Sequence, residues 1–204
     1  MRWLPLLAAS YLVGSLSFSL LVVWLLRRVD VRTVGSGNPG ATNVLRAAGR
    51  WPALAVLLLD IAKGLVPVQL ARRLEAPAGV LAGVAFAAVL GHVYPLYFGF
   101  RGGKGVATGF GAFLALLPLA AGCGLAVFLV TAAVTRYVSL ASLVGAVSVP
   151  IAAWTLALGG WTMPLSPPTL VLTVATVGLI FLRHRPNLRR LAAGNERRLG
   201  GGAS

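Results

Sequence analysis

A glycine-rich segment at residues 35–46 combines the residue types that hold an oxyanion. It reads Gly35-Ser36-Gly37-Asn38-Pro39-Gly40-Ala41-Thr42-Asn43-Val44-Leu45-Arg46. Its glycines let backbone N–H groups approach an anion, and Ser36, Thr42 and Asn43 add hydrogen-bonding groups. A short helix over 41–48 would aim its N-terminus at a phosphate, and Arg46 would supply positive charge.

This segment has two other interpretations. Its glycines spell G-x-G-x-x-G, yet they follow an apolar stretch instead of a β-strand and include a proline, which disfavours a dinucleotide-binding fold. An ordinary turn rich in Gly, Pro and Asn would contain the same residues without binding a ligand.

A second segment, residues 91–108, places a mobile cation beside unobstructed backbone donors. Gly102, Gly103 and Lys104 come just before a predicted helix, so amide groups, an ammonium and a positive helix end would occur together. The run is not a nucleotide-binding P-loop, because Phe98 and Gly105 replace the first glycine and the hydroxyl residue of that motif. A flexible basic loop at a membrane surface is the alternative, although it leaves the glycines around the lysine unexplained.

The third segment runs from Arg183 to Glu196, directly after the last long apolar stretch. Its His184 and Asn187 are spaced i, i+3, which would place them on one face of a helix that could point back into the helix bundle. A structural histidine is the alternative. The remaining cations of the tail are suited to holding it at an anionic leaflet.

Two further features lie near or within apolar stretches. Asp60 and Lys63 are spaced to pair on one helix face, and either would be costly to bury alone in a membrane. Both a charge-neutralised strut and a direct substrate role are open for this pair. Ser139 or Ser142 could donate a hydrogen bond into a site, although many serines in membrane helices only bond their own backbone.

The composition requires a lipid environment. Hydrophobic residues make up 58% of the 204 and charged residues 11%, whereas a soluble domain carries about 25% charged residues. The net charge of +14 does not indicate nucleic acid, because long apolar runs interrupt the basic residues. No metal cluster is visible, and Cys123 is interpreted as a packed core thiol because no histidine or carboxylate is near it in sequence.

The apolar stretches predict an all-α, polytopic integral membrane protein with about seven transmembrane helices and a single domain over residues 1–204. The seven predicted spans are 4–26, 52–71, 77–97, 106–121, 122–135, 138–158 and 165–182. The first stretch is too long for a signal-peptide core and has no clear cleavage site, so we expect it to remain as a span.

The basic residues give the predicted orientation. Most of them fall on one face if the spans alternate, and short basic loops stay in the cytoplasm. The sequence therefore predicts that the N-terminus is outside, the C-terminus is cytoplasmic, and all three polar segments share the cytoplasmic face.

These three segments, in this order, resemble the motifs of the bacterial acyl-phosphate:glycerol-3-phosphate acyltransferases, the PlsY family. The resemblance covers nearly the whole chain. The first two motifs are matched by 35–46 and 91–108, and the third by His184, Asn187, Arg190, Leu191, Gly194 and Glu196. Arg101 and Tyr94 depart from the lysine and phenylalanine that are common there, without removing a required donor.

The resemblance implies transfer of a fatty acyl group from acyl phosphate to the 1-hydroxyl of glycerol 3-phosphate, giving lysophosphatidic acid and phosphate. This is the first acylation of phospholipid synthesis, in the bacterial cytoplasmic membrane, and it needs no cofactor. The expected partners are the two substrates, membrane lipid and, functionally, the enzyme that makes acyl phosphate. The expected catalytic residues are Ser36, Lys104, His184 and Asn187, and the expected substrate-binding residues are Gly37, Asn38, Thr42, Asn43, Arg46, Gly102, Gly103 and Ser142.

The segments have no obvious general base, because the chain has only four acidic residues. Acyl phosphate is already activated, so positioning with a substrate phosphate as proton acceptor would suffice. The main alternative function is a membrane transporter of a small organic phosphate, which would use similar groups but predicts internal repeats that the sequence lacks. Another lipid-phosphate enzyme would need clustered metal-binding carboxylates or an acid-supported histidine.

Overall fold

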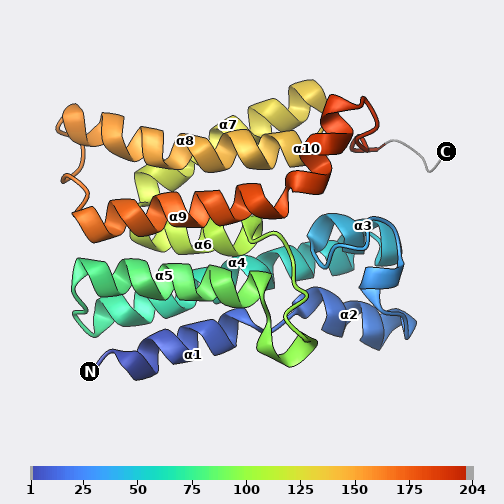
Figure 1. Cartoon of the computed structure of the whole chain (residues 1–204), viewed down its shortest axis with the longest axis horizontal. Coiled ribbons are helices and arrows are strands. Elements are labelled where there is room, and N and C mark those ends of the chain that lie inside the picture. The colour runs from blue at the N-terminus through green and yellow to red at the C-terminus, as the bar shows by residue number, and fades with distance from the viewer. Residues whose placement is uncertain (1, 201–204) are drawn as a thin grey trace. The chain divides into compact units, whose positions relative to one another are not determined.

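The computed structural model describes residues 2–200, and within them every regular element is a helix (Figure 1). The all-α prediction is therefore confirmed. The chain divides between Leu116 and Leu117 into two compact units.

The first unit contains six α-helices and two short 3₁₀ turns. In order they are α1 (Leu4–Gly14), α2 (Phe18–Arg27), η1 (Val31–Thr33), α3 (Ala41–Ala48), α4 (Arg50–Arg73), α5 (Ala78–Val93), η2 (Leu96–Phe98) and α6 (Val106–Leu116). Helix α4 packs on both α5 and α6, and α1 packs on α5. The loop 34–40, which carries the start of the glycine-rich segment, lies between η1 and α3, and the loop 99–105, which carries Lys104, lies between η2 and α6.

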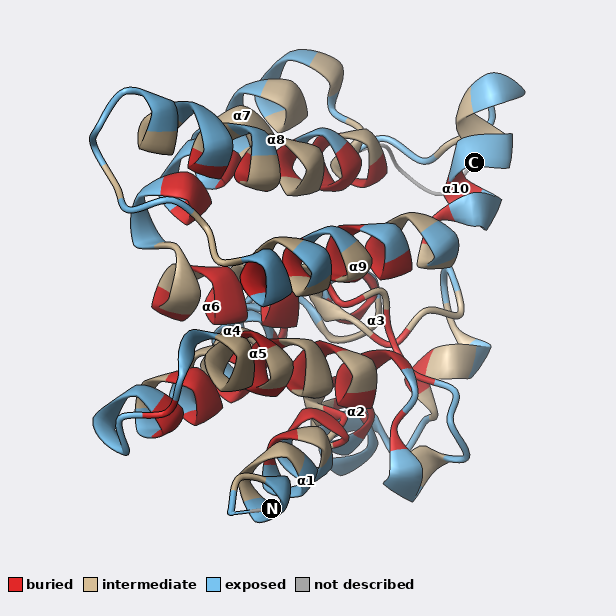
Figure 2. Ribbon diagram, turned by 60° about the vertical axis from the view of Figure 1, so that its left-hand side comes forward, coloured by how far each residue is buried: buried red, intermediate tan, exposed pale blue. Residues whose placement is uncertain are grey.

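The second unit contains α7 (Pro118–Thr135), α8 (Val138–Leu158), α9 (Pro167–Arg183) and α10 (Arg185–Ala192). Helix α8 packs on both α7 and α9. The chain bends by 57° between α9 and α10. Figure 2 shows buried and exposed positions alternating along α9, which is the two-sided character of a helix packed on one face only.

Five segments of the described chain are long and apolar enough to cross a membrane, and the bent pair α9 and α10 would make a sixth. The five are Leu4–Arg27, Arg50–Arg73, Ala78–Phe98, Pro118–Thr135 and Val138–Leu158. Large apolar side chains on the helices, such as Val134 and Leu158, are 78% and 74% exposed. Lipid would cover such side chains, so the helices are those of an integral membrane protein.

The expected span at 106–121 is wrong in its bounds. Helix α6 has 11 residues and reaches only about 16 Å, against a hydrocarbon core of about 30 Å. Helix α7 starts at Pro118, because proline has no N–H to satisfy and its fixed φ suits the first helical position. The predicted boundary between the spans 106–121 and 122–135 therefore lies inside α7.

Cys123 is also not where the sequence suggested. It is exposed on α7, whose buried positions are the small residues Ala120, Ala121 and Gly124. The prediction of a packed core thiol is wrong, because only small side chains fit the face of α7 that packs on α8.

Two pairs of glycines allow the helices of the first unit to touch backbone to backbone. A Cβ at Gly64 in α4 would overlap the carbonyl oxygen of Thr108 in α6, and a Cβ at Gly111 would overlap that of Ile61. Gly14 and Gly91 make the same kind of contact between α1 and α5. Association of helices in lipid depends on such close packing, because no hydrophobic effect drives it there.

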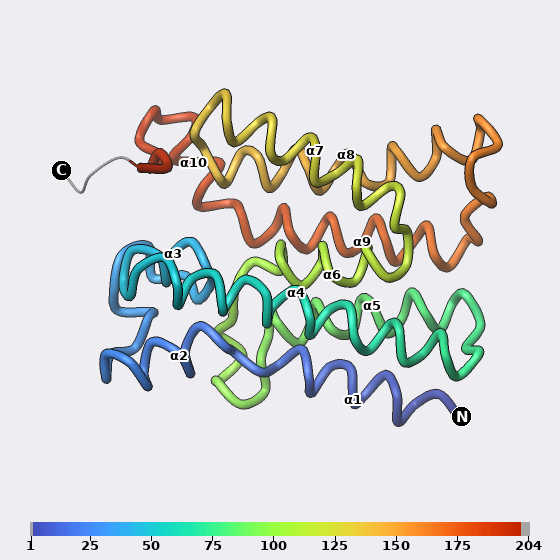
Figure 3. The backbone as a smooth tube through the Cα atoms, turned by 180° about the vertical axis from the view of Figure 1, so that it is seen from behind, coloured from blue at the N-terminus to red at the C-terminus, as the bar shows by residue number. Residues whose placement is uncertain are grey.

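A small apolar core supports the first polar segment. Val23 of α2, Val31 of η1, Val44 of α3 and Val56 of α4 are fully buried together. Figure 3 shows α2, α3 and the start of α4 gathered at one end of the unit. This core fixes both ends of the loop 34–40.

Replacing Gly64 by alanine is expected to destabilise the protein by about 1–3 kcal/mol, because the new methyl group collides with backbone that cannot rotate away. The midpoint of thermal unfolding in detergent measures the change. Gly178→Ala in α9 is the matched control, because a Cβ there meets no atom within 4 Å. Equal midpoints for the two variants would contradict the close packing of α4 on α6.

Candidate active site

The two glycine-rich loops of the first unit lie against each other. A Cβ built at Gly103 would lie 2.5 Å from the carbonyl oxygen of Pro39 and would overlap the His92 ring. Pro39 and Gly103 are both buried. Only glycine fits this contact, so the sequence brings segments 35–46 and 91–108 together through a residue without a side chain.

Asn43 fixes the conformation of the first loop through hydrogen bonds to its backbone. Its Oδ1 accepts a hydrogen bond from the Ser36 N–H at 2.9 Å, and its Nδ2 donates to the carbonyl oxygens of Val31 and Val34, both at 2.9 Å. The side chain is 2% exposed. Both amide hydrogens are thus engaged by the loop backbone, so Asn43 positions Ser36 and does not have the free donor that direct substrate binding would require.

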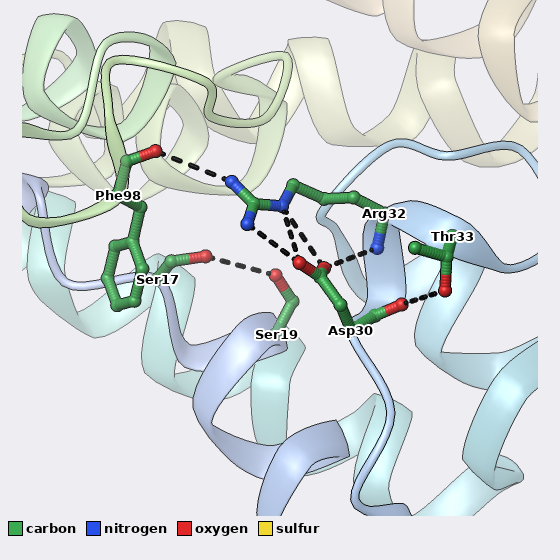
Figure 4. Close-up of polar contacts among 6 residues, drawn as sticks. All are labelled: Ser17, Ser19, Asp30, Arg32, Thr33 and Phe98. Carbon is green, nitrogen blue, oxygen red and sulfur yellow. Dashed lines mark hydrogen bonds and ion pairs between the residues drawn. The ribbon is translucent and has the colours of Figure 1, made fainter.

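An ion pair connects the two loops at a second point. Arg32 contacts the Asp30 carboxylate at 2.7 Å and donates to the carbonyl oxygen of Phe98 at 3.4 Å (Figure 4). The side-chain hydrogen bond from Arg32 outweighs partial burial and holds the pKa of Asp30 below its ordinary value. Asp30 therefore serves as a charged anchor for Arg32 at neutral pH.

The amides of Gly102 and Gly103 have partners within the protein. The Gly102 N–H donates to the carbonyl oxygen of Val93 at 3.2 Å, and the Gly103 N–H donates to that of His92 at 3.1 Å. These bonds satisfy carbonyls at the end of α5. In this structure the two amides therefore fasten the loop to α5, and binding of a phosphate by them stays a prediction.

The other predicted residues of the first unit belong to the same two segments. Ser36 and Arg46 are exposed, whereas Gly37, Asn38, Thr42 and Lys104 are half-buried. Gly37 has a φ of +69° and its N–H donates to Val34 at 3.0 Å, so the loop turns there in a conformation that favours glycine. The loop thus carries hydroxyl, amide and cationic groups on a tightly fixed backbone.

Of the predicted site residues of the second unit, Asn187 belongs to a cluster around a carboxylate. Glu196 Oε1 accepts from Asn187 Nδ2 at 2.6 Å and from Ser139 Oγ at 2.7 Å, and Oε2 accepts from Arg190 Nε at 2.7 Å. Its side chain is 7% exposed. Glu196 therefore fixes the orientation of Asn187, a role that the sequence did not assign to it.

A turn at the end of α10 brings Glu196 back to this position. Gly194 has a φ of +70°, the Asn195 N–H donates to Arg190 at 2.8 Å, and the Gly194 N–H donates to Leu191 at 3.1 Å. This is a Schellman motif, in which glycine adopts the left-handed conformation that reverses the chain. The sequence signal for this cluster is Gly194 followed two residues later by Glu196, because a glycine that ends a helix can turn the chain back toward it.

Burial disfavours the charged form of Glu196, but the hydrogen bonds from Asn187, Ser139 and Arg190 outweigh it and hold its pKa below the ordinary value. Glu196 is therefore ionised at neutral pH. An ionised carboxylate engaged by three donors is an orienting group and not a proton acceptor.

His184 is 1% exposed and lies at the bend between α9 and α10. Its Nδ1 is 2.8 Å from the carbonyl oxygen of Ile180. A carbonyl can only accept, so Nδ1 carries the proton, and in the neutral ring Nε2 is then the acceptor atom. The bend fixes the tautomer of His184 as well as its direction.

The structure distinguishes the two serines of α8. Ser139 donates to Glu196, as described, whereas Ser142 donates to the carbonyl oxygen of Val138 at 2.7 Å within its own helix. Substrate binding by Ser142 stays a prediction. Because its hydroxyl hydrogen is used within the helix, its oxygen would act as a hydrogen-bond acceptor. The described residues include no group of three or more His, Cys, Asp or Glu side chains that could hold a metal ion.

An integral membrane protein of helices, with basic glycine-rich loops suited to phosphate, is the class that the fold and these residues define. The chain belongs to the glycerol-3-phosphate acyltransferase family, whose model matches residues 4–194. Curated relatives named glycerol-3-phosphate acyltransferase include those of Pseudomonas aeruginosa, 48% identical over 97% of this chain and 99% of the relative, and of Methylobacillus flagellatus, 47% identical over 92% of each.

Two solved structures are also similar over 98% of this chain and 96% of theirs. Both are crystal structures of PlsY (YgiH), an integral membrane glycerol 3-phosphate acyltransferase. The glycerol 3-phosphate form matches with a TM-score of 0.89 and 40% identity, and the lysophosphatidic acid form with 0.86 and 38%. The family that the three motifs resemble is thereby confirmed.

The lowered pKa of Glu196 makes the stability of the C-terminal cluster dependent on pH. An acid whose pKa is lower in the folded state stabilises that state above its unfolded pKa, and the contribution disappears as the pH falls through the folded value. We expect the difference in unfolding midpoint between the wild type and Glu196→Gln to be constant above the ordinary value of 4.5 and to shrink below it.

Thermal unfolding in detergent between about pH 7 and about pH 3 measures this difference. Glu75→Gln is the matched control, because Glu75 is an exposed carboxylate. A difference that is independent of pH, or equal in the two variants, would contradict the role of ionised Glu196.

Proposed function

We propose that this protein transfers a fatty acyl group from acyl phosphate to the 1-hydroxyl of glycerol 3-phosphate, producing lysophosphatidic acid and phosphate. The reaction is the first acylation of phospholipid synthesis and takes place at the cytoplasmic face of the bacterial inner membrane. Family membership supports the acceptor and the product, because the similar crystal structures are described as glycerol 3-phosphate and lysophosphatidic acid forms.

The observation that carries the proposal is the contact between the loops at Pro39 and Gly103. Lys104 directly follows Gly103, so the contact brings Lys104 next to the segment that bears Ser36 and Asn38. Both substrates are phosphates and one has an acyl chain that must lie in lipid, so a basic, rigid loop pair on apolar helices fits both requirements.

In the proposed mechanism the hydroxyl oxygen of glycerol 3-phosphate attacks the acyl carbon, the bond from that carbon to the phosphate oxygen breaks, and phosphate leaves. Lys104 and Arg46 stabilise negative charge on the phosphates. Ser36, Asn38, Thr42 and Asn187 orient the two molecules, and His184 polarises a substrate group.

The hydroxyl proton goes to the departing phosphate in this mechanism. The carboxylates of the described chain offer no better acceptor near these groups: Asp30 is paired with Arg32, Asp60 with Lys63, and Glu196 accepts three hydrogen bonds. Because acyl phosphate is a mixed anhydride, positioning supplies most of the required acceleration.

The purified protein in detergent, given glycerol 3-phosphate, is expected to form lysophosphatidic acid with palmitoyl phosphate and not with palmitoyl-CoA or palmitoyl carrier protein. Lys104→Ala should lose most of its activity through a raised KM, because it removes the cation of the second loop. Arg73→Ala is the matched control, because it removes an exposed cation at the far end of α4.

Product from the thioesters would contradict the proposed donor. No product from any of the three donors would overturn the enzyme function and favour transport of an organic phosphate, which uptake into vesicles would measure.

His184→Gln is expected to lower turnover less than about 100-fold, because a residue that only polarises a substrate contributes less than a general base. The pH–rate profile of the variant should keep the shape of the wild-type profile. Complete loss of turnover with both substrates still bound, measured by equilibrium binding, would instead make His184 the base.

A further inference from the structure

Three ionisable side chains are buried together in the first unit, between helices that the proposed mechanism does not otherwise use. Asp60 and Lys63 of α4 are 2% and 4% exposed, and His92 of α5 is 8% exposed. Lys63 Nζ lies 2.8 Å from Asp60 Oδ1, and His92 Nδ1 lies 3.8 Å from the same oxygen, beyond hydrogen-bond distance but close enough for electrostatic attraction when the ring is protonated. The Asp60 carboxylate is thus the centre of a network that joins two spans.

Such a cluster is expensive within a membrane. A single charged side chain in the hydrocarbon region costs about 3 kcal/mol or more unless it is paired or faces water. An apolar pair of similar volume would often hold α4 and α5 together as well. The contacts at the two ends of the network indicate what the charges do.

The lysine end satisfies a break in the first span. Helix α1 ends at Gly14 and α2 begins at Phe18, and Lys63 Nζ donates to the carbonyl oxygen of Leu16 at 2.7 Å. A break at membrane depth leaves carbonyls without helical partners, so each requires another donor. Lys63 also lies 5.5 Å from the Phe18 ring, which adds a cation–π contact.

The histidine end contacts the loop that carries Lys104. The His92 ring occupies the position that a Cβ of Gly103 would take. The carbonyl oxygen of His92 accepts the Gly103 N–H at 3.1 Å, and that of the next residue, Val93, accepts the Gly102 N–H at 3.2 Å. Ring and backbone of one residue thus fix the position from which Lys104 extends.

We propose that Asp60, Lys63 and His92 are positioning residues that hold Lys104 at the distance required to bind a substrate phosphate. Lys63 anchors the network to the break at Leu16, Asp60 orients His92, and His92 supports Gly103. The proposal rests on the proposed function for the identity of the substrates. In this proposal the buried charges contribute to substrate affinity in addition to helix association.

The test compares His92→Gln with Lys104→Ala in the full-length protein. His92→Gln should raise KM about tenfold for the same substrate whose KM Lys104→Ala raises, and should change kcat much less, because a misplaced loop loses binding to one phosphate. The KM of the other substrate should stay close to the wild-type value. If the buried cluster only held the helices together, His92→Gln would instead lower kcat through loss of folded enzyme and leave both KM values unchanged.

Hydrogen exchange at Gly102 and Gly103 provides a measurement that does not need activity. Both amides are hydrogen-bonded to the end of α5, and His92→Gln should speed their exchange about tenfold or more. Exchange at Ser36, whose N–H is held by Asn43, should change less.

Ser10→Ala is the matched control. It removes a buried hydrogen bond of 2.7 Å from Ser10 Oγ to the Val84 carbonyl oxygen, which also joins α1 to α5 but lies away from the loops. This variant should leave the KM values and the exchange at Gly102 and Gly103 unchanged. Equal effects of Ser10→Ala and His92→Gln would overturn the proposal.

The charge pair needs a double variant, because one buried partner alone can prevent folding. Asp60→Asn combined with Lys63→Gln keeps a donor for Leu16 and leaves no uncompensated charge. It should fold and should raise the same KM as His92→Gln. A double variant with wild-type KM values and wild-type loop exchange would overturn the role of the pair.

Failure of the two proposals can be told apart. A wild-type protein that is inactive with every donor overturns the proposed function, and hydrogen exchange still tests the network. An active wild type whose His92→Gln variant exchanges and binds normally overturns the network alone.

Discussion

The contact between Gly103 and the carbonyl oxygen of Pro39 is the constraint on which the loop architecture depends. No side chain fits there, so the backbone of the second loop packs directly on the backbone of the first. The amides of Gly102 and Gly103 are consumed in fastening the second loop to α5, and Asn43 fixes the first loop through three backbone contacts. The side chains that we propose for the chemistry, Ser36, Asn38, Thr42, Arg46 and Lys104, belong to these two fastened segments. Such preorganisation suits a reaction in which positioning and charge stabilisation do most of the work.

Lipid sets a second constraint, because hydrocarbon provides no hydrogen bonds. At the break of the first span Lys63 donates to the carbonyl oxygen of Leu16. At the bend of the last span the His184 ring adds a second hydrogen bond to the carbonyl oxygen of Ile180, which already accepts the His184 N–H. Polar residues that look out of place in apolar helices are therefore found at interruptions. The same logic explains why small residues mediate the contacts of α4 with α6 and of α1 with α5.

The cluster around Glu196 shows how an acidic residue can be required without acting as a base. Its carboxylate accepts hydrogen bonds from Ser139, Asn187 and Arg190, and its pKa is lowered by them. The carboxylate orients the amide of Asn187 from a chain segment that returns through the turn at Gly194. Asp30 plays a similar part for Arg32. Because Asp30, Asp60 and Glu196 are engaged by such partners and Glu75 is exposed beyond the far end of α4, we propose that the proton passes to the departing phosphate.

The sequence by itself determined the helical class, the membrane environment, most of the spans and the family, because apolar run length and glycine-rich basic motifs are local properties. It also located the residues of both loops. Tertiary structure decided which donors already have partners. The backbone amides of Gly102 and Gly103 and the side-chain amide of Asn43 all donate hydrogen bonds within the protein. It also decided that Glu196, to which the sequence assigned no separate role, accepts three side-chain hydrogen bonds. It also decided that 106–121 does not form one full span and that Cys123 faces outward. Hydrogen-bond partners and close backbone approaches join residues far apart in the chain, so no local pattern encodes them.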